Sequence, residues 1–281
     1  MIKQAIIPLA GLGTRLLPIT SVFAKELLPI NGKPGIEYIL DECIEAGIKE
    51  IILIISNKKE IIKKYFYNDK FYQSIIKKKK DPRIIKEYKK ILFYKKKIKF
   101  VYQNKPLGTG DAVLKTKKFI KNKYFLMLLP DDLIMKKNCS KDMIKIHKKH
   151  KASIMASLKV NKNNVDRWGI FSIAKTLDKD NFKISDVVEK PKTKDAPSNN
   201  AVIGRYILNK DIFNFLKNQK KGKGGEIHIT DSIKTMIDNN SKFIGHKFSG
   251  KYLDCGSMEG YIKSTLEIAK LWKFVLLGLA T

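Results

Sequence analysis

The sequence is poor in cysteine, arginine and acidic residues, and it contains no long apolar run. Its three cysteines, Cys43, Cys139 and Cys255, include no CxxC pair, and an odd number of cysteines cannot all pair within the chain. This favours reduced thiols in a cytoplasmic protein over a disulfide scaffold. No run reaches the ~18 apolar residues that a membrane helix needs, so no membrane span is expected. The apolar run 5–10 leads straight into a glycine-rich turn, which indicates a buried strand rather than a signal peptide.

Only four of the 57 basic residues are arginine, and with 27 acids the formal net charge is +30. Proteins that read nucleic acids rely on arginine for two-pronged contacts with bases and phosphates, and lysine is a looser point charge. The lysines accompany many isoleucines and asparagines, which share A- and T-rich codons. Genome composition therefore explains the charge better than an anionic partner, and we expect neither a nucleic acid nor a membrane as partner. A basic nucleic-acid-binding protein stays as the alternative.

Apolar residues make up 43% of the 281 residues and aromatic residues 10%, which excludes a disordered, collagen-like or coiled-coil chain. In the first half, strand-like runs alternate with helical patterns. The expected strands are 5–10, 51–55, 98–102 and 125–129, and the expected helices are 35–46, 58–66 and 111–118. Such alternation predicts an α/β fold with a mostly parallel, Rossmann-like sheet flanked by helices.

From about residue 151 the pattern changes to shorter extended runs followed by helices. The expected strands are 153–160, 168–174, 184–188 and 201–208, and the expected helices are 211–217, 230–238 and 258–271. We therefore expect one domain over residues 1–281, with a first half at 1–150 and an added β-rich half at 151–281. Residues 68–99 are strongly basic, with apolar positions at helical spacing, and predict a solvated lid or a helical hairpin.

The strongest local signal is the glycine-rich loop that follows the first strand. Gly11 and Gly13 allow a tight turn whose N–H groups face an anion. A dinucleotide fingerprint would need a third glycine where Leu16 stands, and there is no Walker A sequence. The pattern favours a phosphate loop with its own cation, Arg15, and a second at Lys25. An ordinary strand–turn is the alternative.

Further motifs follow in order over residues 3–270. They are Lys-Glu-Leu-Leu-Pro at 25–29, Pro-Leu-Gly-Thr-Gly-Asp-Ala-Val at 106–113, Leu-Pro-Asp-Asp at 129–132, Trp-Gly-Ile at 168–170, Val-Val-Glu-Lys-Pro-Lys at 187–192, Ala-Pro-Ser-Asn at 196–199, Gly-Glu-Ile-His-Ile-Thr-Asp at 225–231 and Leu-Asp-Cys-Gly at 253–256. With the glycine loop, this series resembles the sugar-1-phosphate nucleotidylyltransferases. The Ala-Pro-Ser-Asn and Asp-Cys-Gly strings resemble those of the bacterial UTP–glucose-1-phosphate uridylyltransferases.

The resemblance implies the nucleotide-diphospho-sugar transferase fold, with a nucleotide-binding first half and a sugar-binding second half. It implies Mg²⁺-dependent, in-line attack of glucose 1-phosphate on UTP without a covalent intermediate, giving UDP-glucose and pyrophosphate, in a homo-oligomer. The nucleotide would contact Leu9, Ala10, Gly11, Gly13, Thr14, Arg15, Lys25, Gln103 and Gly108. The sugar phosphate would contact Gly169, Glu189, Lys190 and Val202. Asp131 and Asp254 would hold the metal, and Arg15, Lys25 and Asp131 would be catalytic.

Some residues depart from the family's pattern. Ser21 and Ala24 stand where lysine and proline are common, and Asp111 stands where histidine is usual, which leaves the nucleobase open. The alternatives are a thymidylyltransferase, a uridylyltransferase for another hexose 1-phosphate, or a non-catalytic paralogue. We expect Asp132 to face solvent. The apolar segment 271–281 predicts a subunit contact, or packing back onto its own core.

Overall fold

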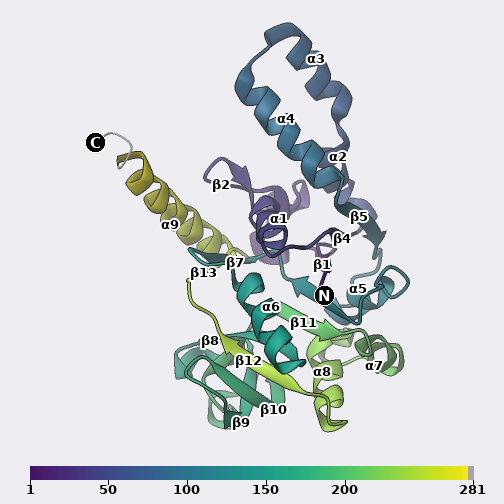
Figure 1. Ribbon diagram of the computed structural model, residues 1–281, viewed down its shortest axis with the longest axis vertical. Coiled ribbons are helices and arrows are strands. Elements are labelled where there is room, and N and C mark those ends of the chain that lie inside the picture. The colour runs from purple at the N-terminus through teal and green to yellow at the C-terminus, as the bar shows by residue number, and fades with distance from the viewer. Residues whose placement is uncertain (278–281) are drawn as a thin grey trace.

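Nine strands form one mixed sheet in the computed structural model, which describes residues 1–277, without the side chains of Lys223 and of residues 272–277 (Figure 1). Across the sheet the strands are β5 (Ile98–Tyr102), β4 (Glu50–Ile55), β1 (Gln4–Pro8), β6 (Tyr124–Leu128), β11 (Asn200–Asn209), β8 (Ser153–Lys159), β12 (Phe243–Lys247), β10 (Asn181–Glu189) and β9 (Gly169–Thr176).

The four strands from β5 to β6 are parallel, as the alternation of strands and helices predicts. The predicted α/β fold is confirmed. In the second half the sheet becomes mixed, because β11 runs antiparallel to β6 and to β8, and β10 runs antiparallel to β12 and to β9. Short loops join several of these strands, and antiparallel pairs need no helical crossover.

The helices are α1 (Gly35–Glu45), α2 (Glu60–Tyr67), α3 (Asp69–Lys79), α4 (Pro82–Lys95), α5 (Thr109–Lys115), α6 (Cys139–His150), α7 (Ile212–Asn218), α8 (Ile229–Asp238) and α9 (Met258–Leu277). Two small sheets pair β2 (Pro29–Ile30) with β3 (Lys33–Pro34), and β7 (Asp132–Met135) with β13 (Lys251–Asp254). The sequence analysis did not predict these two small sheets or β12. Within residues 1–277, no helix is long and apolar enough to cross a membrane.

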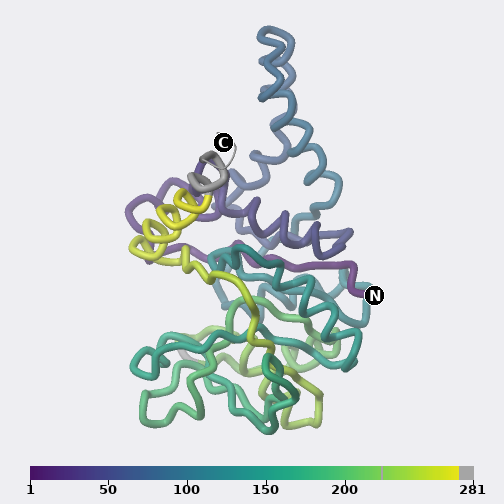
Figure 2. Tube along the Cα trace, turned by 60° about the vertical axis from the view of Figure 1, so that its left-hand side comes forward, coloured from purple at the N-terminus to yellow at the C-terminus, as the bar shows by residue number. Residues whose placement is uncertain are grey.

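The basic segment 68–99 forms a helical hairpin of α3 and α4 that stands away from the body in both views (Figures 1 and 2). Tyr72 and Tyr88 stack across the hairpin with ring centroids 5.1 Å apart, and Lys95 pairs with Asp69. The second half of α4 anchors the hairpin to the body, because Ile91 and Tyr94 are buried and the Tyr94 hydroxyl donates to Asp41 of α1 at 2.5 Å. Of the two predicted forms, the hairpin is confirmed.

Helix α9 extends beyond the predicted end at residue 271 and leans on the first half of the chain (Figure 2). The Tyr261 hydroxyl donates a hydrogen bond to the backbone oxygen of Pro29 at 2.5 Å. The apolar stretch on which the predicted subunit contact rests lies, from Trp272 onward, outside the residues whose side chains are described, so that contact stays a prediction.

Strand β1 separates two apolar cores, because successive side chains of a strand point to opposite faces. Ala5 and Ile7 pack into the core beneath α1, and Ile6 packs into the core on the other face, which also contains Phe125. Both β1 and β6 end at the same edge of the sheet, since they are parallel. The glycine loop and Asp131 follow these two ends, where open α/β sheets bind ligands.

Candidate active site

The glycine loop borders a cavity of about 480 Å³, here called the loop cavity. Predicted site residues on its wall are Ala10, Gly11, Gly13, Thr14, Lys25, Gln103, Gly108 and Asp131. Leu9 lies beneath it: this residue is buried, and its backbone oxygen accepts a hydrogen bond from Nζ of Lys59 at 2.7 Å. The structure therefore gathers residues from four separate motifs around one cavity.

Lys25 reaches from the loop cavity to Asp131, with Nζ 2.7 Å from Oδ2. Burial works against the charge of Lys25, but Asp131 and Glu26 outweigh it and raise the pKa of the ammonium. Burial likewise works against ionisation of Asp131, and Lys25 outweighs it and lowers the pKa of this carboxyl. Both groups are therefore charged at neutral pH.

The sequence analysis missed a second buried ion pair in this wall. Nζ of Lys59 lies 2.8 Å from both carboxylate oxygens of Glu26, and burial lowers the pKa of Lys59 despite this partner. The pair joins the Lys-Glu motif to the segment after β4. A lysine directly after a buried apolar strand is a weak sequence signal, because Lys58 beside it is exposed.

Next to the loop cavity lies a second one of about 220 Å³, here called the acidic cavity because Asp131, Asp132, Glu189 and Asp254 line it. The predicted sugar-side residues Gly169, Glu189 and Val202 are on its wall; Lys190 is not, and its Nζ lies 3.9 Å from Glu189. Arg15 lines this cavity too.

Gly169 packs closely against the walls of the acidic cavity. A Cβ there would lie 3.3 Å from Oε2 of Glu189 and 3.3 Å from Cγ2 of Val202. The Thr230 hydroxyl donates to Oε2 of Glu189 at 3.2 Å and so orients this carboxylate. The sequence analysis did not single out Thr230, although it lies within the Ile-Thr-Asp motif.

Asp131 and Asp254 converge although 122 residues of chain separate them. A Cβ on Gly256 would lie 2.9 Å from Oδ2 of Asp131 and 3.1 Å from Oδ1 of Asp254. Pairing of β7 with β13 brings the two segments together, and the Cys255 amide donates to the Asp131 backbone oxygen at 2.7 Å. Two carboxylates that line one cavity fit a magnesium-type ion, which keeps most of its ligands for water and substrate oxygens.

Among the described residues there is no group of three or more His, Cys, Asp or Glu side chains that could hold a metal ion. Besides Lys25, which contacts Asp131, two arginines lie near these carboxylates. Arg15 lies 3.7 Å from Asp131, and Arg167, which the sequence analysis did not assign, lies 3.8 Å from Asp254. The site therefore has carboxylates for a metal and guanidinium groups for phosphate oxygens.

The expectation that Asp132 faces solvent is wrong. Its Oδ1 accepts a hydrogen bond from the Tyr252 hydroxyl at 2.6 Å, and its Oδ2 accepts one from the Gly204 amide at 2.9 Å. Burial, together with the neighbouring charge of Asp131, raises the pKa of Asp132 to about 6. The residue turns inward because β7 begins there and pairs with β13, which carries Tyr252.

Comparison with known proteins agrees with this geometry. The model of the nucleotidyl transferase family matches residues 4–270. The chain belongs to the nucleotidyl transferase family. Within this family it is similar to UTP–glucose-1-phosphate uridylyltransferase 2 of Staphylococcus saprophyticus, with 35% identity over 272 residues, which cover 95% of this chain and 92% of that protein.

Two solved structures of the family are similar over nearly the whole chain. A UDP-glucose pyrophosphorylase complexed with UDP-glucose is 37% identical, with a TM-score of 0.84 over 96% of this chain and 99% of that chain. A UTP-bound UGPase from Acinetobacter baumannii is 32% identical, with a TM-score of 0.86 over 98% and 99% of the two chains. The predicted family and fold are thereby confirmed.

For this nucleotidyl transferase we predict that Gly256→Ala folds and loses activity. The added methyl group would lie 2.7 Å from an Arg15 nitrogen and within about 3 Å of both carboxylates, so it fills the space of a metal or phosphate. The expected loss in kcat/KM is about tenfold to a hundredfold, measured by pyrophosphate release. Gly35→Ala, at the start of α1 and outside both cavities, is the control, because a Cβ there would come no closer than 3.5 Å to another atom. Equal activities would contradict a functional gap at Gly256.

Proposed function

We propose that this chain transfers the uridylyl group of UTP to α-D-glucose 1-phosphate and releases pyrophosphate. The observation that carries the proposal is the junction of the two cavities. Leu129 and Asp131 line both, so a nucleotide in the loop cavity and a sugar phosphate in the acidic cavity would meet beside Asp131. The names of the relatives and their UTP and UDP-glucose complexes support these substrates.

The reaction needs positioning and charge neutralisation more than it needs a base. The attacking phosphate oxygen is already ionised, and it approaches the α-phosphorus opposite the leaving pyrophosphate. Lys25 and Arg15 would bind the triphosphate and stabilise the charge that grows on the leaving group. Lys190 would neutralise the sugar phosphate, while Glu189 and the Gly169 backbone would hold the sugar ring.

Nucleotidyl transferases use a divalent metal, and we propose Mg²⁺ held by Asp131 and Asp254. The convergence of their oxygens beside Gly256 fits such an ion. When bound, the ion would neutralise phosphate oxygens of both substrates. Because Lys25 lies on Asp131 in the present structure, its ammonium would have to move towards the phosphates as they bind.

A substrate panel tests the proposed reaction. Purified protein is assayed for pyrophosphate release with UTP, dTTP, CTP, ATP and GTP against glucose 1-phosphate and other hexose 1-phosphates. We expect the highest kcat/KM with UTP and glucose 1-phosphate. Preference for dTTP or for another hexose would favour one of the two alternative transferases. No turnover with any pair would favour the non-catalytic paralogue, against which the complete set Arg15, Lys25, Asp131, Glu189, Lys190 and Asp254 argues.

We predict that Arg15→Lys impairs the chemical step more than substrate binding. Lysine keeps the positive charge but loses the guanidinium fork that binds two phosphate oxygens at once. The value of kcat should fall about tenfold to a hundredfold, while the KM for UTP rises less than about threefold. Steady-state kinetics at saturating sugar phosphate separates the two effects. A large rise in KM with unchanged kcat would contradict this role. Arg83→Lys, in the exposed hairpin, is the matched control.

A further inference from the structure

Asp111 is a buried acid whose carboxylate contacts two neighbouring side chains, Gln103 and Lys115. It lies in the first turn of α5 and is 5% exposed. Its Oδ2 accepts a hydrogen bond from Nε2 of Gln103 at 2.8 Å, and its Oδ1 lies 3.4 Å from Nζ of Lys115. A carboxylate paired with a lysine only accepts hydrogen bonds, so Gln103 has to turn its amide nitrogen towards Asp111.

The second amide hydrogen of Gln103 is also committed. Nε2 donates to the backbone oxygen of Gly108 at 3.0 Å. That oxygen is held in place because Gly108 has a φ of +93° and packs against Ile227, where an added Cβ would lie 2.7 Å from the backbone oxygen. The amides of Ile227 and Gly110 donate to Leu107 and Ile227 oxygens at 2.7 and 2.8 Å. The loop around Gly108 is therefore pinned to the second half of the chain.

The remaining polar atom of Gln103, Oε1, accepts no hydrogen bond from any residue that the structure describes. Gln103 lines the loop cavity. Its Oε1 is not one of the side-chain atoms that are both fully buried and without a hydrogen-bond partner. With both hydrogens directed to Asp111 and Gly108, the amide has one acceptor left for a ligand.

We propose that Asp111 is a positioning residue for nucleobase selection: it locks the Gln103 amide so that Oε1 offers an acceptor to the base. Uracil and thymine carry a hydrogen on N3 and match this acceptor. Cytosine has a lone pair on N3 and is repelled. The inference rests on the proposed function in one respect, that the base binds beside Gln103 in the loop cavity. It gives a role to the acid that departs from the family's usual histidine.

The expected preference for UTP over CTP follows from the free-energy cost of a mismatched polar pair. A site built around a hydrogen bond rejects a ligand that cannot make it, because the buried polar groups of the site are left unpaired. Locked by two acceptors, Gln103 cannot rotate its amide to suit cytosine. We expect wild-type protein to bind UTP at least about tenfold more tightly than CTP. The lock does not separate UTP from dTTP, since both bases have N3–H.

The test measures equilibrium binding of UTP, dTTP and CTP by titration calorimetry, with Mg²⁺ and without sugar phosphate. The asparagine of Asp111→Asn has nearly the same volume as the aspartate, but its amide can donate as well as accept hydrogen bonds. Lys115 attracts the amide oxygen, so the amide nitrogen faces Gln103. The Gln103 amide can then rotate. The ratio of the CTP to the UTP dissociation constant should fall about tenfold, with weaker UTP binding. Asp142→Asn, a half-buried acid on α6 that pairs with Lys145 and lines neither cavity, is the matched control and should leave the ratio unchanged.

Each outcome decides the proposal. If the ratio of the CTP to the UTP dissociation constant is the same in wild type and in a folded Asp111→Asn variant, the lock is overturned. If this variant does not fold, Asp111→Ser gives the same readout, because a hydroxyl also donates and accepts. A wild-type protein that prefers CTP overturns the lock whatever the reaction. A wild type that prefers UTP and loses this preference on substitution supports the lock even if glucose 1-phosphate is not its substrate, so the two failures are distinguishable.

Discussion

Asp131→Asn should fold and lower kcat by at least about a thousandfold, close to 4 kcal/mol of transition-state stabilisation. Asparagine keeps the volume of the side chain but removes the charge that would hold the metal and that now pairs with Lys25. Pyrophosphate release at saturating Mg²⁺ and substrates measures the loss, and circular dichroism verifies the fold. Asp142→Asn makes the same chemical change at a half-buried position on α6 that lines neither cavity, and this variant should remain active. Near-normal turnover in a folded Asp131→Asn protein would contradict the metal assignment.

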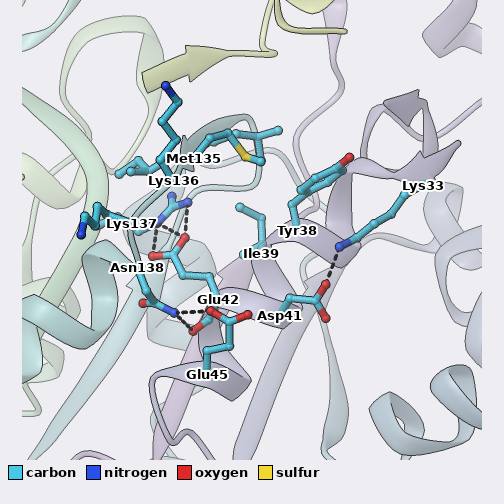
Figure 3. A pocket seen from close by; sticks show the side chains of 13 residues that line it. Lys33, Tyr38, Ile39, Asp41, Glu42, Glu45, Met135, Lys136, Lys137 and Asn138 are labelled. Atoms are coloured by element: carbon cyan, nitrogen blue, oxygen red, sulfur yellow. Dashed lines mark hydrogen bonds and ion pairs between the residues drawn. The ribbon is translucent and has the colours of Figure 1, made fainter. Parts of the chain in front are cut away.

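Glu42→Gln should lower the free energy of unfolding by about 3–5 kcal/mol. Glu42 of α1 accepts hydrogen bonds from Nε and Nη2 of Arg205 at 3.0 and 2.8 Å, and Arg205 is 0% exposed. The Ser140 hydroxyl and amide donate to the same carboxylate. In Figure 3 dashed lines mark the contacts of Glu42 with Arg205, and Asn138 and Glu45 lie beside them. The neutral side chain leaves the arginine charge buried without a counter-ion.

Urea unfolding measures this loss, with Glu45→Gln as control, since Glu45 lies on the same helix and is exposed. The double variant Glu42→Leu with Arg205→Met should lose less than Glu42→Gln alone, because it removes both charges. Equal stabilities of wild type and Glu42→Gln would contradict the view that this ion pair is energetically coupled. Arg205 also donates to the backbone oxygen of Leu129 at 3.1 Å, so its loss should disturb the segment before Asp131 as well.

The scarcity of arginine is itself informative in light of the structure. Arg15 and Arg167 line the acidic cavity, and Arg205 forms the buried pair with Glu42. Only Arg83 is fully exposed, in the hairpin. Where lysine supplies nearly every other positive charge, these three positions use the planar, multi-donor guanidinium that an ammonium cannot replace. This signal was present in the sequence and would have pointed to Arg167.

The sequence by itself determined the alternation of strands and helices in the first half, the basic, amphipathic character of 68–99, and the loop and carboxylate that follow β1 and β6. These features depend on local periodicity, glycine positions and the ends of apolar runs, all of which are readable along the chain. The family resemblance supplied the pairing of Asp131 with Asp254, because no local pattern relates residues so far apart.

Only the tertiary structure decided which polar side chains turn inward. Asp132 looked exposed because it follows another acid, yet pairing of β7 with β13 places it against Tyr252. The sequence analysis assigned no partner to Lys59 or Asp111, and they become buried partners of Glu26 and Gln103 once distant strands and loops come together. The physical reason is common to all three. A charge is stable inside a protein only when a partner lies within hydrogen-bond distance, and folding, not sequence spacing, brings that partner there.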